Sequence, residues 1–216
     1  MVDSDTIFIS EKNIKLLRDL FRPKQKAFGK GEMILEKNRP KQCLCLLLKG
    51  TAYLCMENES GSKQLLDYFT RGQLLYQEML PAPDNGHCFI QAKYPCAAAY
   101  LSHQELLEHI LKQADRELAE LLSAMLRSAV SAGNQHCHIL QQKTIRGKLL
   151  AFLHSQKIRQ QSSTLHIPMP YSDLADYLAI DRSSLMTELS RMHAEGLIEK
   201  KTRTIVLREQ SVGSPP

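Results

Sequence analysis

The sequence contains no apolar run of the roughly 18 residues that a membrane-spanning helix requires. Its start, MVDSDTIFIS, is acidic and lacks the basic and apolar regions of a secretory signal peptide. No two cysteines have the C-x-x-C spacing of common zinc sites and redox motifs. These absences argue against a membrane partner and against export, and they predict a cytoplasmic protein.

The cysteine pattern favours reduced, buried thiols over disulfides, because nothing in the sequence directs export. The six cysteines are Cys43, Cys45, Cys55, Cys88, Cys96 and Cys137. Thiol oxidation remains an alternative mode of control, with Cys43, Cys45 and Cys137 as the candidates.

Positive charge is concentrated toward the C-terminus. The 216-residue chain has a net charge of +5. From Ile139 onward it has 11 Lys and Arg against 7 Asp and Glu, whereas residues 1–138 have 17 against 16. A nucleic-acid partner requires such a basic region.

The segment Tyr171–Ile198 predicts two short helices joined by a tight turn at residues 179–181. Asp181 is placed as the N-cap of the second helix, with its carboxylate accepting from the first free N–H groups. Ala175 is small enough for the two helices to cross closely, as a helix-turn-helix requires.

The second helix, Arg182–Ala194, has two different faces. One is an apolar stripe of Leu185, Leu189 and Met192. The other has no acidic residue and carries Arg182, Ser183, Thr187, Ser190 and Arg191. Hydroxyl groups can bond base edges, and arginine can fork onto guanine. An ordinary helical hairpin is the alternative, but the cap and the polar outer face favour a helix in the DNA major groove.

Two β-prone runs follow, at residues 197–199 and 204–207, and they predict a small hairpin, or wing. Lys200, Lys201 and Arg203 are placed in its turn. There their charges would meet phosphates, which position a protein without reading sequence.

Short β-prone runs with turns at roughly 8–12-residue spacing fill residues 28–101 and predict a jelly-roll barrel. Helices are expected at Glu11–Leu20 before it and Ser102–Leu111 after it. A cupin enzyme with the same barrel is the alternative. It needs a His/Glu metal cluster, whereas the barrel offers only His87 and no H-x-H, so neither an enzyme nor a metal site is predicted.

A proline-free helix is expected at residues 114–139. A 4-3-4-3-4 seam typical of a two-helix coiled coil contains Leu118, Leu122, Met125, Ala129, Ala132 and His136. Leu121, Leu126 and Val130 are expected to pack on the barrel. Because one barrel can cover only one flank, the pattern favours a homodimer over a core helix within one subunit.

The predicted fold class is α+β. We expect a jelly-roll domain with flanking helices at 1–113, a long dimerisation helix and hinge at 114–140, a winged helix-turn-helix domain at 141–209 and a disordered tail at 210–216.

The order of these parts resembles the Crp/Fnr family of bacterial transcription regulators over nearly the whole chain. The matching motifs are Lys30-Gly31-Glu32, LLLKG at Leu46–Gly50, Arg71-Gly72-Gln73 and DLADYLAIDRSSLMTELSRMHAEGLI. The resemblance implies a homodimer on a palindromic promoter site, contact with RNA polymerase if it activates, and an effector in the barrel against the long helix. It implies base contacts by Arg182, Ser183 and Thr187, with Ser184 near phosphate. Position 187 is commonly Arg in the family and is Thr here, so the DNA sequence that this chain recognises should differ from the usual half-site of the family.

The resemblance also gives effector-binding candidates, which are Gln77, Glu78, His87, Met125 and Ser128. Members that bind cyclic AMP carry a Gly-Glu pair and then an Arg-Ser pair for the phosphate. Here the stretches are Tyr76-Gln77-Glu78 and His87-Cys88-Phe89, and no arginine lies between Arg71 and Arg116. An enclosed anion without a cation is costly to desolvate. We therefore predict a small-molecule effector other than cyclic AMP.

No cofactor is predicted. Fnr-type sensors hold iron–sulfur with an N-terminal cysteine cluster, but the first cysteine here is Cys43. Haem needs only an axial His or Cys, which His136-Cys137-His138 could supply. His136 and His138 point about 200° apart on a helix, which favours a solvated or dimer-interface role for them.

Overall fold

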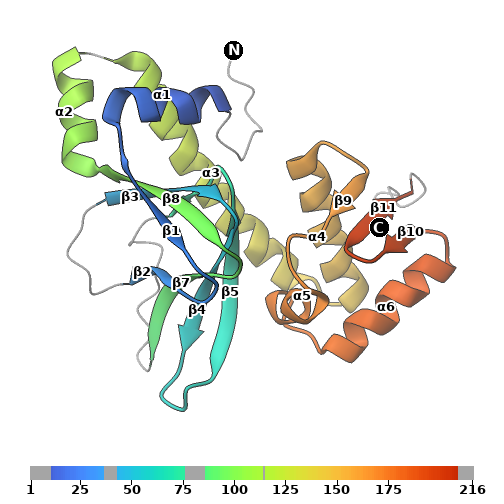
Figure 1. Cartoon of the computed structure of the whole chain (residues 1–216). Coiled ribbons are helices and arrows are strands. Elements are labelled where there is room, and N and C mark those ends of the chain that lie inside the picture. Colours follow the sequence, from blue (N-terminus) through green and yellow to red (C-terminus); the bar gives the residue numbers. More distant parts are fainter. Residues whose placement is uncertain (1–10, 37–42, 76–85, 114, 209–216) are drawn as a thin grey trace. The chain divides into compact units, whose positions relative to one another are not determined.

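The computed structural model describes residues 11–36, 43–75, 86–113 and 115–208. The chain forms two compact units, residues 1–132 and 133–216. The boundary falls within the long helix α3 (Arg116–Gln141), which supplies residues to both units (Figure 1). None of the described helices is long and apolar enough to cross a bilayer.

The described part of the first unit contains two antiparallel four-stranded sheets with the orders β1-β8-β3-β6 and β2-β7-β4-β5. The strands are β1 (Lys24–Phe28), β2 (Met33–Glu36), β3 (Cys43–Lys49), β4 (Thr51–Glu57), β5 (Lys63–Thr70), β6 (Leu74–Leu75), β7 (His87–Ala92) and β8 (Cys96–Ser102). Two such sheets face to face form a jelly roll, which confirms the predicted α+β class.

The apolar core of this jelly roll lies between the two sheets. Its members include Phe28, Leu47, Leu54, Phe69, Ile90 and the thiols of Cys45, Cys88 and Cys96. Strand β1 is missing from the sequence prediction because four of its five residues are exposed, so it has no apolar alternation to detect.

A second apolar core joins helices to the outside of the sheet β1-β8-β3-β6. It is formed by α1 (Glu11–Phe21), α2 (His103–Gln113) and the first half of α3. Leu118, Leu121 and Met125 of α3 are buried in it, and Leu122 is partly buried against it. Leu126 and Val130, however, are 49% and 61% exposed.

The predicted assignment of the two flanks of α3 is therefore wrong in part. Leu121 packs on the sheet as expected, but Leu126 and Val130, which were expected to do the same, face outward. Leu118, Leu122 and Met125, which were expected in the dimer seam, face the sheet instead. Helical periodicity shows that two apolar flanks exist, but it does not say which one a neighbouring sheet covers.

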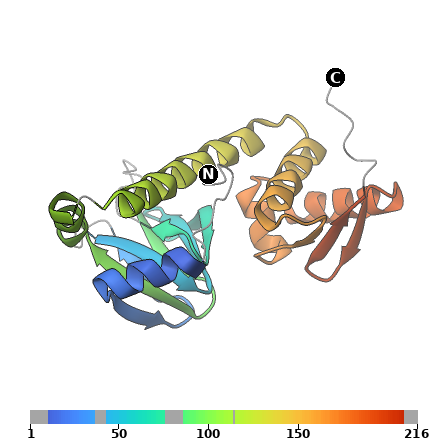
Figure 2. The same cartoon turned by 90° about the horizontal axis from the view of Figure 1, so that it is seen from above.

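The second unit packs three helices beside a small sheet of order β10-β11-β9 (Figure 2). Its elements are α4 (Ile145–Gln160), β9 (Thr164–His166), α5 (Tyr171–Tyr177), α6 (Arg182–Ala194), β10 (Ile198–Lys201) and β11 (Thr204–Leu207). Strand β9 lies at the edge of the sheet and ends before Pro168.

Candidate nucleic-acid interface

Helix α6 has one buried face and one solvent-exposed face. The three side chains of its apolar stripe are fully buried: Leu185, Leu189 and Met192. Arg182, Ser183 and Thr187 are exposed on the opposite side. This orientation confirms the prediction of inward leucines and outward hydroxyl and guanidinium groups. We refer to Arg182, Ser183 and Thr187 as the outer face of α6.

A short turn sets α5 across α6. Leu174, Ala175 and Leu178 are buried, and the N–H of Ile180 donates to the carbonyl of Ala175 at 3.0 Å. Ala179 has a φ of 49°, in the left-handed region that favours glycine. The predicted helix-turn-helix geometry is present, and its turn carries some backbone strain.

Asp181 occupies the N-cap position of α6, but its carboxylate makes no capping hydrogen bond. The predicted side-chain cap is therefore wrong, although its position is right. The backbone carbonyl of Asp181 instead accepts from the N–H of Leu185 at 2.9 Å.

Other residues of the polar face are engaged within α6. Nε of Arg191 donates to Glu195 at 3.2 Å, and the hydroxyl of Ser190 donates to the carbonyl of Met186 at 2.9 Å. Ser184 is half-buried. Arg191 must therefore leave Glu195 before it can reach a duplex.

The wing is present as the antiparallel pair β10–β11, with Lys201 opposite Thr204. Arg203 lies in its turn and is exposed, but Lys200 and Lys201 are residues of β10, so their predicted place in the turn is wrong. Nζ of Lys200 lies 5.3 Å from the ring centre of Tyr171, at the start of α5. This cation–π contact draws Lys200 toward the helix-turn-helix.

Glu199 partly neutralises the wing. Its carboxylate lies 3.3 Å from Nζ of Lys201 and 3.4 Å from Nη2 of Arg208. The hydrogen bond from Lys201 holds the pKa of Glu199 below its usual value. Lys201 therefore has an internal partner that competes with phosphate.

Two basic residues of α4 hold the helix-turn-helix and were missed by the sequence prediction. Arg146 contacts Glu188 on α6 and Glu195 at the C-cap of α6. Nζ of Lys148 donates to the carbonyls of Leu178 and Ala179, at 2.9 and 3.4 Å. The sequence signal for the contact with Arg146 was Glu188, the one acidic residue in the segment Arg182–Ala194.

The effector candidates are not gathered into one site by the described residues. Met125 is buried between α3 and the sheet β1-β8-β3-β6, whereas His87 is an exposed residue of β7, in the other sheet, with its ring 5.1 Å from that of Phe89. Gln77 and Glu78 lie outside the described residues, as does the side chain of Ser128.

His136 is half-buried against α5 in the second unit, so the prediction of a solvated side chain is wrong for this residue. Its ring stacks on Tyr177 of α5 at a centroid distance of 3.9 Å, and its Nε2 lies 2.9 Å from the carbonyl oxygen of Tyr177. The described residues contain no cluster of three metal-ligating side chains.

The described thiols divide into two kinds. Cys45, Cys55, Cys88 and Cys96 are buried thiols outside any disulfide, as predicted, whereas the prediction of burial is wrong for Cys137, which is exposed on α3. Burial raises the pKa of Cys96, which keeps that thiol protonated and unreactive.

These two units define a protein with a jelly-roll domain followed by a winged helix-turn-helix domain. The model of the cyclic nucleotide-binding domain matches residues 25–113, and that of the Crp-like helix-turn-helix domain matches residues 147–211. The chain belongs to the Crp/Fnr family of transcription regulators.

Solved structures share this fold at low sequence identity. FixK2 from Bradyrhizobium japonicum is 19% identical, with a TM-score of 0.67 over 88% of this chain and 94% of that chain. CprK in complex with OCPA is 16% identical, with a TM-score of 0.68 over 94% and 96%. A cyclic nucleotide-binding domain containing protein from Listeria monocytogenes is 13% identical, with a TM-score of 0.72 over 93% and 99%. No curated protein sequence matches significantly.

Proposed function

We propose that this chain regulates transcription by binding a specific double-stranded DNA site through the outer face of α6. The observation that carries the proposal is the burial of Leu185, Leu189 and Met192, which turns Arg182, Ser183 and Thr187 outward. Guanidinium and hydroxyl groups on the first turns of a recognition helix suit base edges in the major groove. The exposed Arg203 in the wing adds a cation for phosphate.

Selection of genomic DNA fragments with the purified protein tests this function. A regulator of this kind should enrich a small set of fragments that share an inverted repeat, because two-fold protein symmetry is mirrored in the site. Run-off transcription on an enriched fragment then decides between activation through RNA polymerase and repression. Recovery of fragments without a shared sequence would contradict the proposal.

We further propose a homodimer through the exposed flank of α3. Residues at 4-3-4-3-4-3 spacing along this flank are Ala119, Ser123, Leu126, Val130, Gly133, Cys137 and Leu140. Leu126, Val130 and Leu140 are among the exposed large apolar side chains of the described chain. Leu at d with β-branched Val at a favours a parallel two-helix coiled coil.

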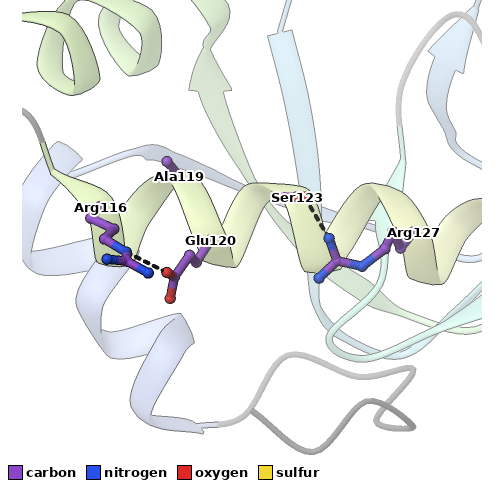
Figure 3. A pocket seen from close by; sticks show the side chains of 5 residues that line it. All are labelled: Arg116, Ala119, Glu120, Ser123 and Arg127. Carbon is purple, nitrogen blue, oxygen red and sulfur yellow. Dashed lines mark hydrogen bonds and ion pairs between the residues drawn. The ribbon is translucent and has the colours of Figure 1, made fainter. Parts of the chain in front are cut away.

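A hollow on the same side of α3 supports this dimer. Its lining residues are Arg116, Ala119, Glu120, Ser123 and Arg127 (Figure 3). Arg116 pairs with Glu120 at 2.7 Å, and Nη1 of Arg127 donates to Ser123 at 2.6 Å. The small Ala119 and Ser123 leave room between these pairs for side chains of a partner helix.

The proposed effector is a small molecule other than cyclic AMP, held in the first unit. Where the family's arginine–serine pair is expected, this chain has Cys88 and Phe89, which are both buried. The related CprK was solved with OCPA, which supports the idea of a non-nucleotide ligand. A panel of small organic acids, scored by the thermal stabilisation of the full chain, tests this proposal.

Thiol control is the second candidate, and the exposure of Cys137 favours it. Cys45 is fully buried, which argues against Cys45 as the oxidised residue. Unchanged DNA affinity after peroxide treatment would count against thiol control, and a change that disappears in Cys137→Ser would support it.

A further inference from the structure

Arg146 joins α4 to α6 through three hydrogen bonds. Its Nε lies 2.5 Å from Oε1 of Glu188, and Nη1 and Nη2 lie 2.8 and 2.9 Å from the two carboxylate oxygens of Glu195. The planar guanidinium suits this forked arrangement, which a lysine ammonium cannot reproduce.

The position of Arg146 in α4 is unfavourable for α4 alone. Arg146 lies in the first turn of that helix, which has no acidic residue, and a cation there opposes the helix dipole. The hydrogen bonds with Glu195 and Glu188 raise the pKa of Arg146. The interactions that stabilise the charged side chain of Arg146 therefore come from Glu188 and Glu195 rather than from α4 itself.

The two carboxylates hold α6 at two levels. Glu188 and Glu195 are two turns apart on one side of the helix, so the contact spans about 10 Å along its axis. Side-chain tips lie about 5–6 Å from a helix axis, so a rotation of α6 by about 10° would move Ser183 or Thr187 by roughly 1 Å. Such a displacement weakens a directional hydrogen bond to a base.

This contact lies away from the outer face. The side chain of Glu188 is only 14% exposed, and it points about 100° around the helix from Thr187. Lys148, two residues after Arg146, holds the preceding turn through the carbonyls of Leu178 and Ala179. The first turn of α4 thus fixes the helix-turn-helix at its turn and along α6.

We propose that Arg146 is a positioning residue for sequence discrimination, which fixes the rotation of α6 through Glu188 and Glu195 so that the outer face meets the correct base edges. This inference rests on the proposed DNA-binding function. A direct phosphate contact by Arg146 is the alternative, and the two differ in their effects on random DNA and on salt dependence.

The test measures the affinity of the full chain for an enriched genomic fragment and for a random duplex, at several salt concentrations. The variants are Arg146→Gln, Arg146→Lys and the double variant Glu188→Gln/Glu195→Gln. The control is Arg18→Gln, which removes one charge from the exposed side of α1. Thermal unfolding verifies that each variant is folded.

Arg146→Gln and Arg146→Lys should both lower the ratio of specific to random affinity by about tenfold, the loss expected when one base contact is displaced. The slope of log affinity against log salt should not change, because no phosphate contact is lost. The double variant should also lose discrimination, although it removes negative charge and so binds random DNA more tightly. Arg18→Gln should retain the wild-type ratio.

Equal losses on both DNAs with a shallower salt slope would show that Arg146 contacts phosphate and would overturn the inference. An unchanged ratio in the double variant would overturn it as well. If the wild-type chain itself does not distinguish the two DNAs, the proposed function fails and the inference fails with it.

Discussion

Three arginines at the helix-turn-helix have different environments. Arg182 is exposed on the outer face of α6, Arg191 is held by Glu195 at the C-cap of the same helix, and Arg146 of α4 is bound by Glu188 and Glu195. Of these three, Arg182 can reach a base without breaking one of these contacts. Arg182 is therefore the residue whose removal should affect sequence reading most directly.

Arg182→Ala should weaken binding to the preferred DNA site by about 1–3 kcal/mol and weaken binding to random DNA much less. Fluorescence anisotropy with both duplexes measures this difference. Lys201→Ala is the comparison, and it should weaken binding to both duplexes equally, because a phosphate contact affects all sequences alike. The loss of affinity should be small, because Lys201 is paired with Glu199. Equal losses on both duplexes for Arg182→Ala would contradict its assigned role.

Ala179→Gly should stabilise the chain by roughly 0.5–1 kcal/mol, because the left-handed conformation of the turn is strained for alanine and not for glycine. Chemical denaturation of the full chain measures the change. Ala151→Gly, within α4, is the control and should destabilise by about 1 kcal/mol. A loss of stability in Ala179→Gly would show that the turn is not strained.

Single residues were predictable where local pattern decides their environment. The inward Leu185 and outward Ser183 follow from helical periodicity alone. The pairing of Arg146 with Glu188 and Glu195 was not predictable, because 42 and 49 residues separate the partners. Their contact depends on how α4 packs on α6, which no local pattern encodes.

Elements were predicted well where apolar spacing is strong. Helix α6 and strand β11 have the predicted bounds, Arg182–Ala194 and Thr204–Leu207. Strand β1 was missed because it is polar and exposed. The flanks of α3 were assigned wrongly except at Leu121, because both flanks are apolar and only the packed sheet decides between them.

Leu126→Glu/Val130→Glu should convert a dimer into monomers, because two carboxylates per chain would enter the proposed coiled-coil seam. Analytical ultracentrifugation of the full chain measures the mass. Leu111→Glu is the control, since Leu111 on α2 is 80% exposed and lies outside the seam. A dimer that survives the double substitution would place the interface elsewhere.

The contact between α4 and α6 should weaken in acid. The hydrogen bond from Arg146 lowers the pKa of Glu195 in the folded chain, so the unfolded chain binds more protons between the two pKa values. The stabilisation is complete above the ordinary carboxyl pKa of about 4.3 and is lost as pH falls through the lowered value.

Circular dichroism melts between pH 7 and pH 3 measure this effect. The wild-type Tm should fall more steeply below about pH 4.3 than that of Glu195→Gln, which has no proton to bind there. Glu59→Gln, in an exposed turn, is the control. Parallel curves for wild type and Glu195→Gln would show that this ion pair does not contribute to stability.

At the scale of the whole molecule, the chain combines two units that match two different family models. The model that matches the first unit is described as a cyclic nucleotide-binding domain, but a fold does not dictate the ligand. Ligand chemistry depends on the residues at the site, and here no arginine lies between Arg71 and Arg116.

Isothermal calorimetry with cyclic AMP should therefore show no binding at micromolar concentrations, because this stretch lacks an arginine to pair with the enclosed phosphate. The second readout is the affinity of the chain for an enriched genomic DNA fragment, measured with and without cyclic AMP. This affinity should not change. Micromolar binding of cyclic AMP would contradict this reading of the first unit.

A salt titration of DNA binding tests the central claim most directly. The full chain should prefer an enriched genomic fragment over random duplex by roughly 10³-fold or more, and log affinity for both should fall linearly with log salt concentration. Equal affinity for the two duplexes, or binding that does not respond to salt, would contradict the account.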